Sequence, residues 1–232
     1  MIKRLLLLCG LLLFVFPTLS AKRVSQATKN KLNHELPILG LSVGDEVFIR
    51  TFKKEKRLEL WIRPETQQQF ILFRTYPICY YSGRLGPKIR RGDKVTPEGF
   101  YRITKKDLNP YSRFHLSLDI GYPNTYDRQF SRTGSMIKIH GACDAVGCFA
   151  MSNLQIEEIY YLVQQALKNG QNKIPVHSFP FHLTDENLSQ YQDSKWFDFW
   201  QQLQVGYRLF NETKIPPIID VENKRYMIYS SE

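Results

Sequence analysis

Apolar and polar residues alternate in short stretches along the central part of the chain. Three such stretches follow one another at 47–52, 57–62 and 70–73, and they are rich in β-branched and aromatic side chains. A period of two is typical of β-strands, and the short intervals between these stretches favour antiparallel pairing. The strand pattern returns in four later segments, at 100–104, 114–120, 136–140 and 174–179.

Two segments show helical spacing instead. Ser152-Asn-Leu-Gln155 has the arrangement of a capping box, and apolar residues recur behind it every three or four positions until Asn169-Gly170. This pattern predicts a helix at 153–169 whose apolar stripe faces the core. A second predicted helix, near 194–205, is dense in aromatic residues. Residues 22–44 form a polar lead-in, in which we expect one short helical turn. The tail is predicted to be irregular around the two prolines at 216–217 and to end in a strand at 225–229.

Together these elements predict a mixed α+β fold. We expect a curved antiparallel β-sheet or sandwich at its core, with helices packed outside it. A length of 232 residues, 43% of them hydrophobic, suits one substantial core with a modest appendage.

Residues 1–21 have the layout of a secretory signal peptide. A basic head with Lys3 and Arg4 precedes an apolar run over 5–16 and a group of small residues that ends at Ala21. The run is shorter than the ~20 residues that a membrane-spanning helix needs, so a permanent anchor is the less favoured alternative. We expect cleavage after Ser20 or Ala21 and export to the periplasm.

The charge of the chain narrows the class of partner. The formal net charge is +10, and it falls to +8 without residues 1–21, which hold two basic residues and no acidic one. Such a charge attracts nucleic acid, anionic lipid or an acidic polymer such as a cell wall, although scattered solvated lysines would give the same total. The sequence has no RNA-binding aromatic motif, helix-turn-helix signal or zinc-finger spacing. We therefore expect no nucleic-acid partner.

Three cysteines remain in the mature chain: Cys79, Cys143 and Cys148. In an oxidising compartment, an odd number leaves one thiol unpaired. A bridge between Cys143 and Cys148 would remove a thiol that lies near a histidine in the sequence, whereas a bridge between Cys79 and Cys143 would spare it. The sequence does not decide between these pairings.

His140 and Cys148 carry the clearest chemical signal. The histidine ends a predicted strand, and the cysteine follows Gly147 eight residues later. An imidazole and a thiol suffice for nucleophilic acyl transfer, in which the imidazole takes the thiol proton and the thiolate attacks a carbonyl. The helix predicted to start after Ser152 would turn its positive end toward Cys148 and favour the thiolate. Backbone N–H groups around Gly147 can hold a developing oxyanion.

A zinc site is a minor alternative for the same residues. His140 and the three cysteines have suitable donor atoms, but the paired C-x-x-C spacing of structural zinc sites is missing. The acyl-transfer chemistry needs no metal or cofactor, and we expect none.

Several of these segments resemble the L,D-transpeptidase (YkuD) catalytic domain. The family's signatures match His140-Gly141, Gly147-Cys148 and the upstream Thr96-Pro-Glu-Gly-Phe-Tyr101. The likeness to the YafK-like branch of the family extends through five further segments, at 82–88, 108–110, 113–117, 121–124 and 176–181. The resemblance implies an L,D-transpeptidase-like catalytic domain at 45–190, with an N-terminal lead-in at 22–44 and a C-terminal helical extension at 191–232. The chain departs from the common family pattern in two ways. The interval from His140 to Cys148 is contracted to eight residues, as in the YafK-like branch, and Val146 precedes the glycine while Ala150 stands where arginine is common.

The resemblance also implies roles for individual residues. Cys148 would be the nucleophile that forms a thioester with peptidoglycan stem peptides, and His140 would be the proton donor and acceptor. The backbone carbonyl of Gly141 would orient the imidazole, and the backbone of Gly147 would stabilise the oxyanion.

Arginine matches the geometry of carboxylates, which a stem peptide carries. Arg90, Arg91 and Arg113, together with His115, are therefore candidate substrate-binding residues. Each is equally well explained as part of a solvated basic surface.

The leading interpretation is an exported cysteine acyl transferase that remodels or cross-links the cell wall and so affects cell shape. A first alternative is a hydrolytic amidase that releases a wall-linked lipoprotein from diaminopimelate. A second is a non-catalytic peptidoglycan-binding protein. Because the resolving acceptor depends on the hydration of the pocket, the sequence leaves transferase and hydrolase activity open.

Overall fold

The computed structural model describes residues 21–231, so the predicted leader at 1–21 lies outside it except for Ala21. Within the described range, no helix is both long and apolar enough to cross a bilayer. Helices and three β-sheets combine in a mixed architecture, which confirms the predicted fold class.

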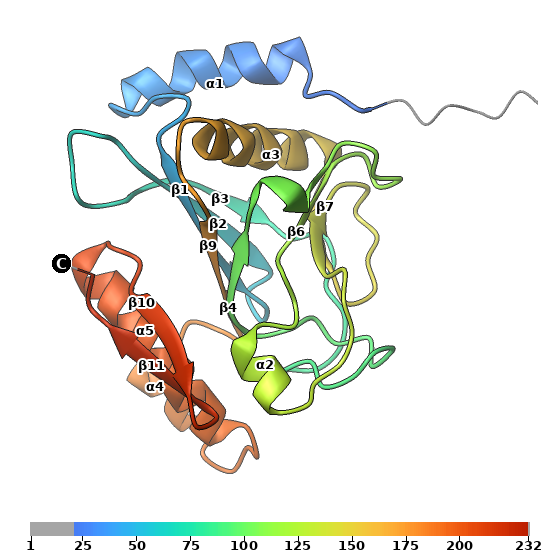
Figure 1. Ribbon diagram of the computed structural model, residues 1–232, viewed down its shortest axis with the longest axis vertical. Coiled ribbons are helices and arrows are strands. Elements are labelled where there is room, and N and C mark those ends of the chain that lie inside the picture. The colour runs from blue at the N-terminus through green and yellow to red at the C-terminus, as the bar shows by residue number, and fades with distance from the viewer. Residues whose placement is uncertain (1–20, 232) are drawn as a thin grey trace, which may run out of the picture.

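A five-stranded sheet forms the centre of the molecule (Figure 1). Its order is β3-β2-β1-β9-β4, and all neighbours are antiparallel except β1 and β9. The strands are β1 (Glu46–Phe52), β2 (Arg57–Arg63), β3 (Ile71–Pro77), β4 (Gly99–Ile103) and β9 (Ile174–Phe179). Nearly every residue of β1 and β2 is buried, because other elements cover both faces of the sheet.

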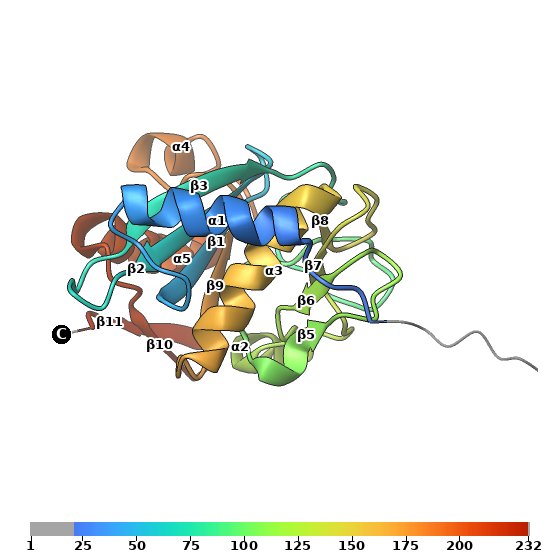
Figure 2. The same ribbon diagram turned by 90° about the horizontal axis from the view of Figure 1, so that it is seen from above.

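Two helices cover one face of this sheet. α3 (Asn153–Lys168) packs its apolar stripe on the sheet, and α1 (Gln26–Ile38) crosses over it (Figure 2). The expectation of a single short turn in the lead-in was wrong. α1 has a narrow stripe, with only Thr28, Leu32 and Leu36 buried, so its helical pattern is weak in the sequence. Contact with α3 stabilises it.

The C-terminal extension covers the opposite face. It contains α5 (Phe197–Thr213) and a hairpin of β10 (Ile218–Glu222) and β11 (Arg225–Tyr229), preceded by α4 (Asp185–Ser189). The predicted final strand is confirmed by β11. The segment at 216–217 is irregular, as predicted, but the strand β10 that follows it was not expected, so the extension is not only helical. α5 also runs eight residues beyond the predicted end of the helix.

A buried ion pair beside the large sheet is contacted by a tryptophan of this extension. Lys53 Nζ lies 2.8 Å from Glu98 Oε1, and both side chains are fully buried. Lys53 also donates to three backbone carbonyls in the segment 84–96, and Trp200 Nε1 on α5 donates to Glu98 Oε2. Both charges therefore have hydrogen-bonding partners, which a buried pair requires.

A second sheet, in the order β5-β6-β7-β8, lies beside the start of α3. Its strands are β5 (Leu108–Asn109), β6 (Ser117–Asp119), β7 (Lys138–His140) and β8 (Phe149–Ala150), and β7 and β8 are parallel. The short helices η1 (Lys105–Asp107) and α2 (Thr125–Gln129) belong to the connections. The predicted strands at 114–120 and 136–140 are shorter than expected, because His115 and Met136 adopt positive φ, which breaks an extended strand.

Candidate active site

The small sheet brings His140 and Cys148 together. Ile139 pairs with Phe149 and His140 with Ala150, so Cys148 lies beside Lys138 at the start of the pair. His140 is the last residue of β7, and Cys148 immediately precedes β8, so the two residues lie in adjacent segments of the small sheet.

His140 is held in one orientation by its neighbours. Its Nδ1 lies 2.7 Å from the carbonyl oxygen of Gly141, which can only accept, so Nδ1 carries the proton and Nε2 is the free base. The ring of Phe114 stacks on the imidazole at a centroid distance of 4.6 Å. The carbonyl of Phe114 also accepts the N–H of Gly141 at 3.0 Å. Phe114 thus supports both the imidazole and the carbonyl that orients it.

Gly141 has no space for a side chain. A Cβ at this position would lie 2.6 Å from Asn153 Oδ1 and 2.9 Å from the carbonyl oxygen of Phe114. Asn153 Oδ1 accepts the N–H of Ala142 at 2.9 Å, so the first turn of α3 holds the loop that follows the histidine.

Cys148 is a free thiol with intermediate burial. Its Sγ accepts from the N–H of Lys138 at 3.4 Å and lies 3.8 Å from the carbonyl oxygen of Met136. Among the described residues, no hydrogen bond joins Sγ to His140. The residue is thus partly exposed, and its sulfur is positioned by the backbone of Met136 and Lys138.

The electrostatics of the site favour a neutral pair. Burial lowers the pKa of His140, with a further contribution from the charge of Lys138, while the contact with Gly141 opposes it. Burial raises the pKa of the Cys148 thiol, and Lys138 only partly offsets this. The expectation that the site would favour a thiolate is thus wrong for the resting site. The capping box of α3 is confirmed, and it engages the N–H groups of Ser152 and Gln155 at the helix start.

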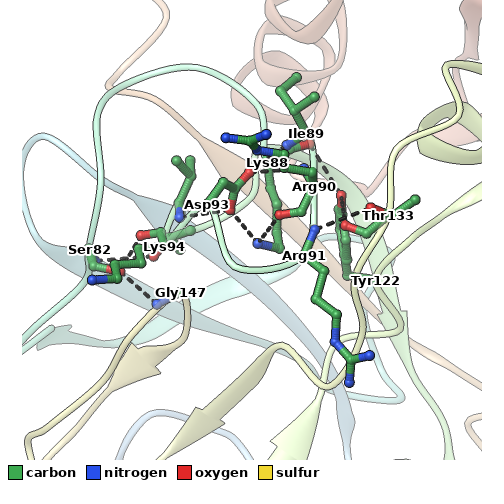
Figure 3. Close-up of polar contacts among 12 residues, drawn as sticks. Ser82, Lys88, Ile89, Arg90, Arg91, Asp93, Lys94, Tyr122, Thr133 and Gly147 are labelled. Atoms are coloured by element: carbon green, nitrogen blue, oxygen red, sulfur yellow. Dashed lines mark hydrogen bonds and ion pairs between the residues drawn. The ribbon is translucent and has the colours of Figure 1, made fainter.

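Two hydroxyl groups hold the peptide units around the nucleophile. The N–H of Gly147 donates to Ser82 Oγ at 2.6 Å, and Ser82 Oγ donates to the carbonyl of Lys94 (Figure 3). Thr96 Oγ1 donates to the carbonyl of Cys148 at 3.3 Å. Ser82 and Thr96 are both buried. The N–H of Ser82 donates to Thr96 Oγ1, and the N–H of Thr96 donates to the carbonyl of Ser82. We call this pair of hydroxyls the Ser82–Thr96 clamp.

The clamp changes the expected oxyanion donor. The N–H of Gly147, which we expected to stabilise the oxyanion, is already bonded to Ser82. The N–H of Cys148 has no acceptor among the described residues and is the remaining candidate. Gly147 has φ +82°, a conformation that favours glycine, so its role is to shape the turn before the nucleophile.

A disulfide joins Cys79 and Cys143 and leaves Cys148 free. The bridge lies next to β8, since Cys79 N donates to the carbonyl of Ala150 and Cys143 N to that of Met151. It also ties up two of the four donors considered for zinc. Within residues 21–231, no group of three histidine, cysteine or acidic side chains is arranged to hold a metal ion.

Arg90 and Arg91 are exposed on a loop at 82–95, which we call the basic loop. Asp93 organises it by accepting from the N–H groups of Ile89 and Arg90 and from Lys88 Nζ. Burial tends to raise the pKa of Asp93, but these hydrogen bonds lower it. The side chain of Arg91 extends away from the loop in Figure 3. The loop and the Gly147 turn are neighbours through Ser82.

The other two candidate substrate-binding residues differ from each other. Arg113 is exposed, with its guanidinium 4.9 Å from the centroid of the Phe114 ring, on the side of the molecule that carries His140. His115 instead bonds Glu157 on α3 at 2.8 Å. Its imidazole is therefore engaged within the protein, contrary to a role in gripping substrate. Lys88 is buried in the same way, against Asp93.

Sequence reasoning missed Phe114, Lys138 and the hydroxyls of the clamp. Ser82 and Thr96 lie in segments that were recognised as family motifs, yet their contacts join positions 65 and 52 residues apart. Only Lys138 had a local signal, because a strand that ends at His140 places residue 138 on the same face.

A free thiol and an oriented imidazole thus lie at the β7–β8 end of the small sheet, and hydroxyls from a Ser–Gly and a Thr–Pro segment hold the peptide units around the thiol. The chain belongs to the YkuD family of L,D-transpeptidase catalytic domains, which its residues 47–177 match. This confirms the family that the sequence motifs predicted.

Among individual relatives, YafK of Escherichia coli K12, assigned by its name to the L,D-transpeptidases, is 43% identical over 186 residues. The match covers 80% of this chain and 75% of YafK, and the YafK of Escherichia coli O157:H7 gives the same figures. The solved structure of the helical cell shape determining protein Pgp2 from Campylobacter jejuni is 19% identical, with a TM-score of 0.45 over 82% of this chain and 80% of Pgp2. Bd1075 of Bdellovibrio bacteriovorus is 20% identical, with a TM-score of 0.42 over 77% of this chain and 78% of Bd1075. The family assignment rests on the domain match and on YafK.

Proposed function

We propose that this protein is an exported cysteine acyl transferase that acts on peptidoglycan stem peptides. The observation that carries the proposal is the pairing of a reachable Cys148 thiol with a His140 imidazole whose Nδ1 proton is fixed on Gly141. Membership of the L,D-transpeptidase family supplies the class of substrate.

The reaction starts from a neutral thiol and a neutral imidazole. His140 Nε2 takes the thiol proton as Cys148 Sγ attacks the carbonyl carbon of an L-centred residue in the stem peptide. The N–H of Cys148 donates to the oxyanion, a contact typically worth about 3 kcal/mol in the transition state. The C–N bond then breaks, the imidazolium returns its proton to the departing amine, and the acyl group remains on sulfur as a thioester.

A second nucleophile completes the cycle. His140 takes a proton from an amine or a water molecule as it attacks the thioester, the C–S bond breaks, and the sulfur regains its proton. An amine acceptor yields a new peptide cross-link or attaches a protein. A water acceptor yields hydrolysis, and acting on diaminopimelate this would release a wall-linked lipoprotein.

Two features support action in the periplasm. Disulfides such as Cys79–Cys143 persist in oxidising compartments outside the cytosol. The predicted signal peptide at 1–21 would direct export, and the positive net charge would draw the enzyme to an acidic wall.

The test incubates the full chain with purified sacculi and with lipoprotein-linked muropeptides, and then measures product masses. The wild type should yield cross-linked products, free lipoprotein, or both, which separates amine from water as acceptor. Cys148→Ala should yield neither and still sediment with sacculi. As a matched control, Cys79→Ala/Cys143→Ala removes the other two described cysteines and should retain product formation. Unchanged product formation by Cys148→Ala would eliminate this nucleophile, and a wild type that binds sacculi without any product would be a non-catalytic binding protein.

A further inference from the structure

A separate cavity lies between the large sheet and the C-terminal hairpin. It has a volume of about 380 Å³, within the range of small-molecule sites. One wall comes from β4 and the other from the start of β10, with Pro216 and Pro217 at its edge. Figure 1 shows the β10–β11 hairpin near β4 and α2, and Figure 2 also places it near α2. None of the lining residues belongs to the His140–Cys148 site, and the hairpin wall lies beyond the domain match at 47–177.

The charged residues that line this cavity are all basic. Arg102, Arg128 and Lys173 are exposed, and no aspartate or glutamate lines the cavity. Arg128 is directed by hydrogen bonds to the carbonyl of Pro123 and to Thr125 Oγ1. Within the described chain, Arg102 and Lys173 have no salt-bridge partner. Such a mouth attracts an anion and is repelled by a cation.

The floor of the cavity is aromatic and contains an unpartnered nitrogen. Phe100, Tyr101 and Tyr226 supply apolar surface. His177 on β9 also lines the cavity, its side chain is 2% exposed, and its Nδ1 has no hydrogen-bond partner in the described protein. The rings of Phe48 and Phe100 pack edge-on against its imidazole, each at a centroid distance of 4.7 Å. Nδ1 itself has almost no accessible surface, so a ligand in the cavity would meet the rest of the His177 imidazole.

Burial and the neighbouring Arg50 lower the pKa of His177 to about 3, so the imidazole is neutral near pH 7. It can therefore exchange a hydrogen bond with a ligand, but it adds no positive charge to the floor. The cavity has its positive charge at the mouth, an apolar middle and one neutral polar atom at depth.

We propose that this cavity, the C-terminal pocket, binds a small organic anion. The ligand would carry a carboxylate or phosphate toward Arg102, Arg128 and Lys173, an apolar or aromatic body over Phe100, and a hydroxyl or amide that reaches His177. The C-terminal extension then contributes a wall of a binding site in addition to covering the sheet.

Three matched probes test each part of this recognition on the full chain. 4-Hydroxybenzoate has the anion, the ring and a distal hydroxyl, benzoate lacks the hydroxyl, and 4-hydroxybenzamide lacks the charge. Ligand-observed NMR gives the affinities, and the ¹⁵N shifts of the His177 imidazole report contact at the floor. We expect saturable binding of 4-hydroxybenzoate, at least fivefold weaker binding of the amide, and a His177 shift with 4-hydroxybenzoate that benzoate does not produce.

Variants place the probe in the molecule. Arg102→Gln/Lys173→Gln should weaken 4-hydroxybenzoate about fivefold or more, whereas Lys105→Gln/Lys106→Gln, an equal loss of exposed charge on η1, should not. Cys148→Ala should leave binding unchanged, which makes this test independent of the proposed reaction. A further experiment adds soluble muropeptides. If they compete with 4-hydroxybenzoate, the cell wall is the source of the anion. If they do not compete, the anion is a free metabolite. The proposal is overturned by failure of 4-hydroxybenzoate to saturate, by binding that Arg102→Gln/Lys173→Gln leaves intact, or by a His177 nitrogen that never shifts.

Discussion

Removing the hydroxyl of Ser82 should slow catalysis more than it weakens substrate binding. In Ser82→Ala, the N–H of Gly147 loses a 2.6 Å hydrogen bond, and the carbonyl of Lys94 loses its donor. A buried polar group without a partner costs about 1–3 kcal/mol, so the free energy of unfolding should fall by that amount. For a chain of this size, the melting temperature should drop by about 2–4 °C per kcal/mol. The turn that carries Cys148 also becomes free to shift, and a displacement of about 1 Å at a reacting group can lower the rate about 100-fold.

The assay measures kcat and KM for product release from muropeptides, together with urea unfolding. We expect kcat to fall about 10- to 100-fold while KM changes less than threefold. Thr28→Val is the matched control, because Thr28 Oγ1 is a buried hydroxyl that donates to Glu157 at 2.8 Å, in the contact between α1 and α3. It should lose similar stability and keep its kcat. A Ser82→Ala enzyme with kcat within twofold of the wild type would refute the positioning role of the clamp.

Three further predictions concern charge and covalent structure. The charge of Lys138 lowers the pKa of His140, so Lys138→Gln should move the acid limb of the pH profile of kcat/KM to higher pH. An acid limb that stays in place or moves to lower pH would contradict the neutral-pair mechanism. The Cys79–Cys143 bridge closes a loop with a sequence separation of 64, so its loss should lower the free energy of unfolding by about 2–4 kcal/mol. Urea titrations with and without reductant measure this difference. Equal curves would show that the bridge is not formed in solution. Burial tends to raise the pKa of Glu157, but hydrogen bonds from Ser25, Thr28 and His115 lower it to about 2. The contribution of Glu157 to stability should therefore be complete above about pH 4.5 and be lost as the pH falls toward 2. The difference in unfolding free energy between wild type and Glu157→Gln should close over that range. A difference that persists at pH 2 would contradict this prediction.

The sequence was sufficient where a signal is local. Strands β1, β2 and β9 and helix α3 have apolar periods that each element's own residues display, and they lie within one or two residues of the predicted bounds. His140 and Cys148 could be paired from the sequence because only eight residues separate them. The direction of their pKa shifts could not be predicted from the sequence, because it depends on burial by neighbours from other segments.

Features that depend on distant contacts were missed. β8 has two residues and exists only because β7 and Tyr80 flank it. α1 depends on α3 for its stability, and its own pattern is weak. His115 looked like a free imidazole beside Arg113, but a carboxylate on α3, 42 residues away, engages it.

The Lys53–Glu98 pair has a practical consequence for where this chain can be divided. A version that stops at residue 190 would take Trp200 away from Glu98 and strip α5 from the aromatic residues beneath it. The Glu98 carboxylate would then lose one of its hydrogen-bond donors and become exposed to water, next to the segment that leads from Ser82 to Thr96. The tail is therefore not a removable appendage, and exchanging it between relatives should succeed only when the residue at position 98 is exchanged with it.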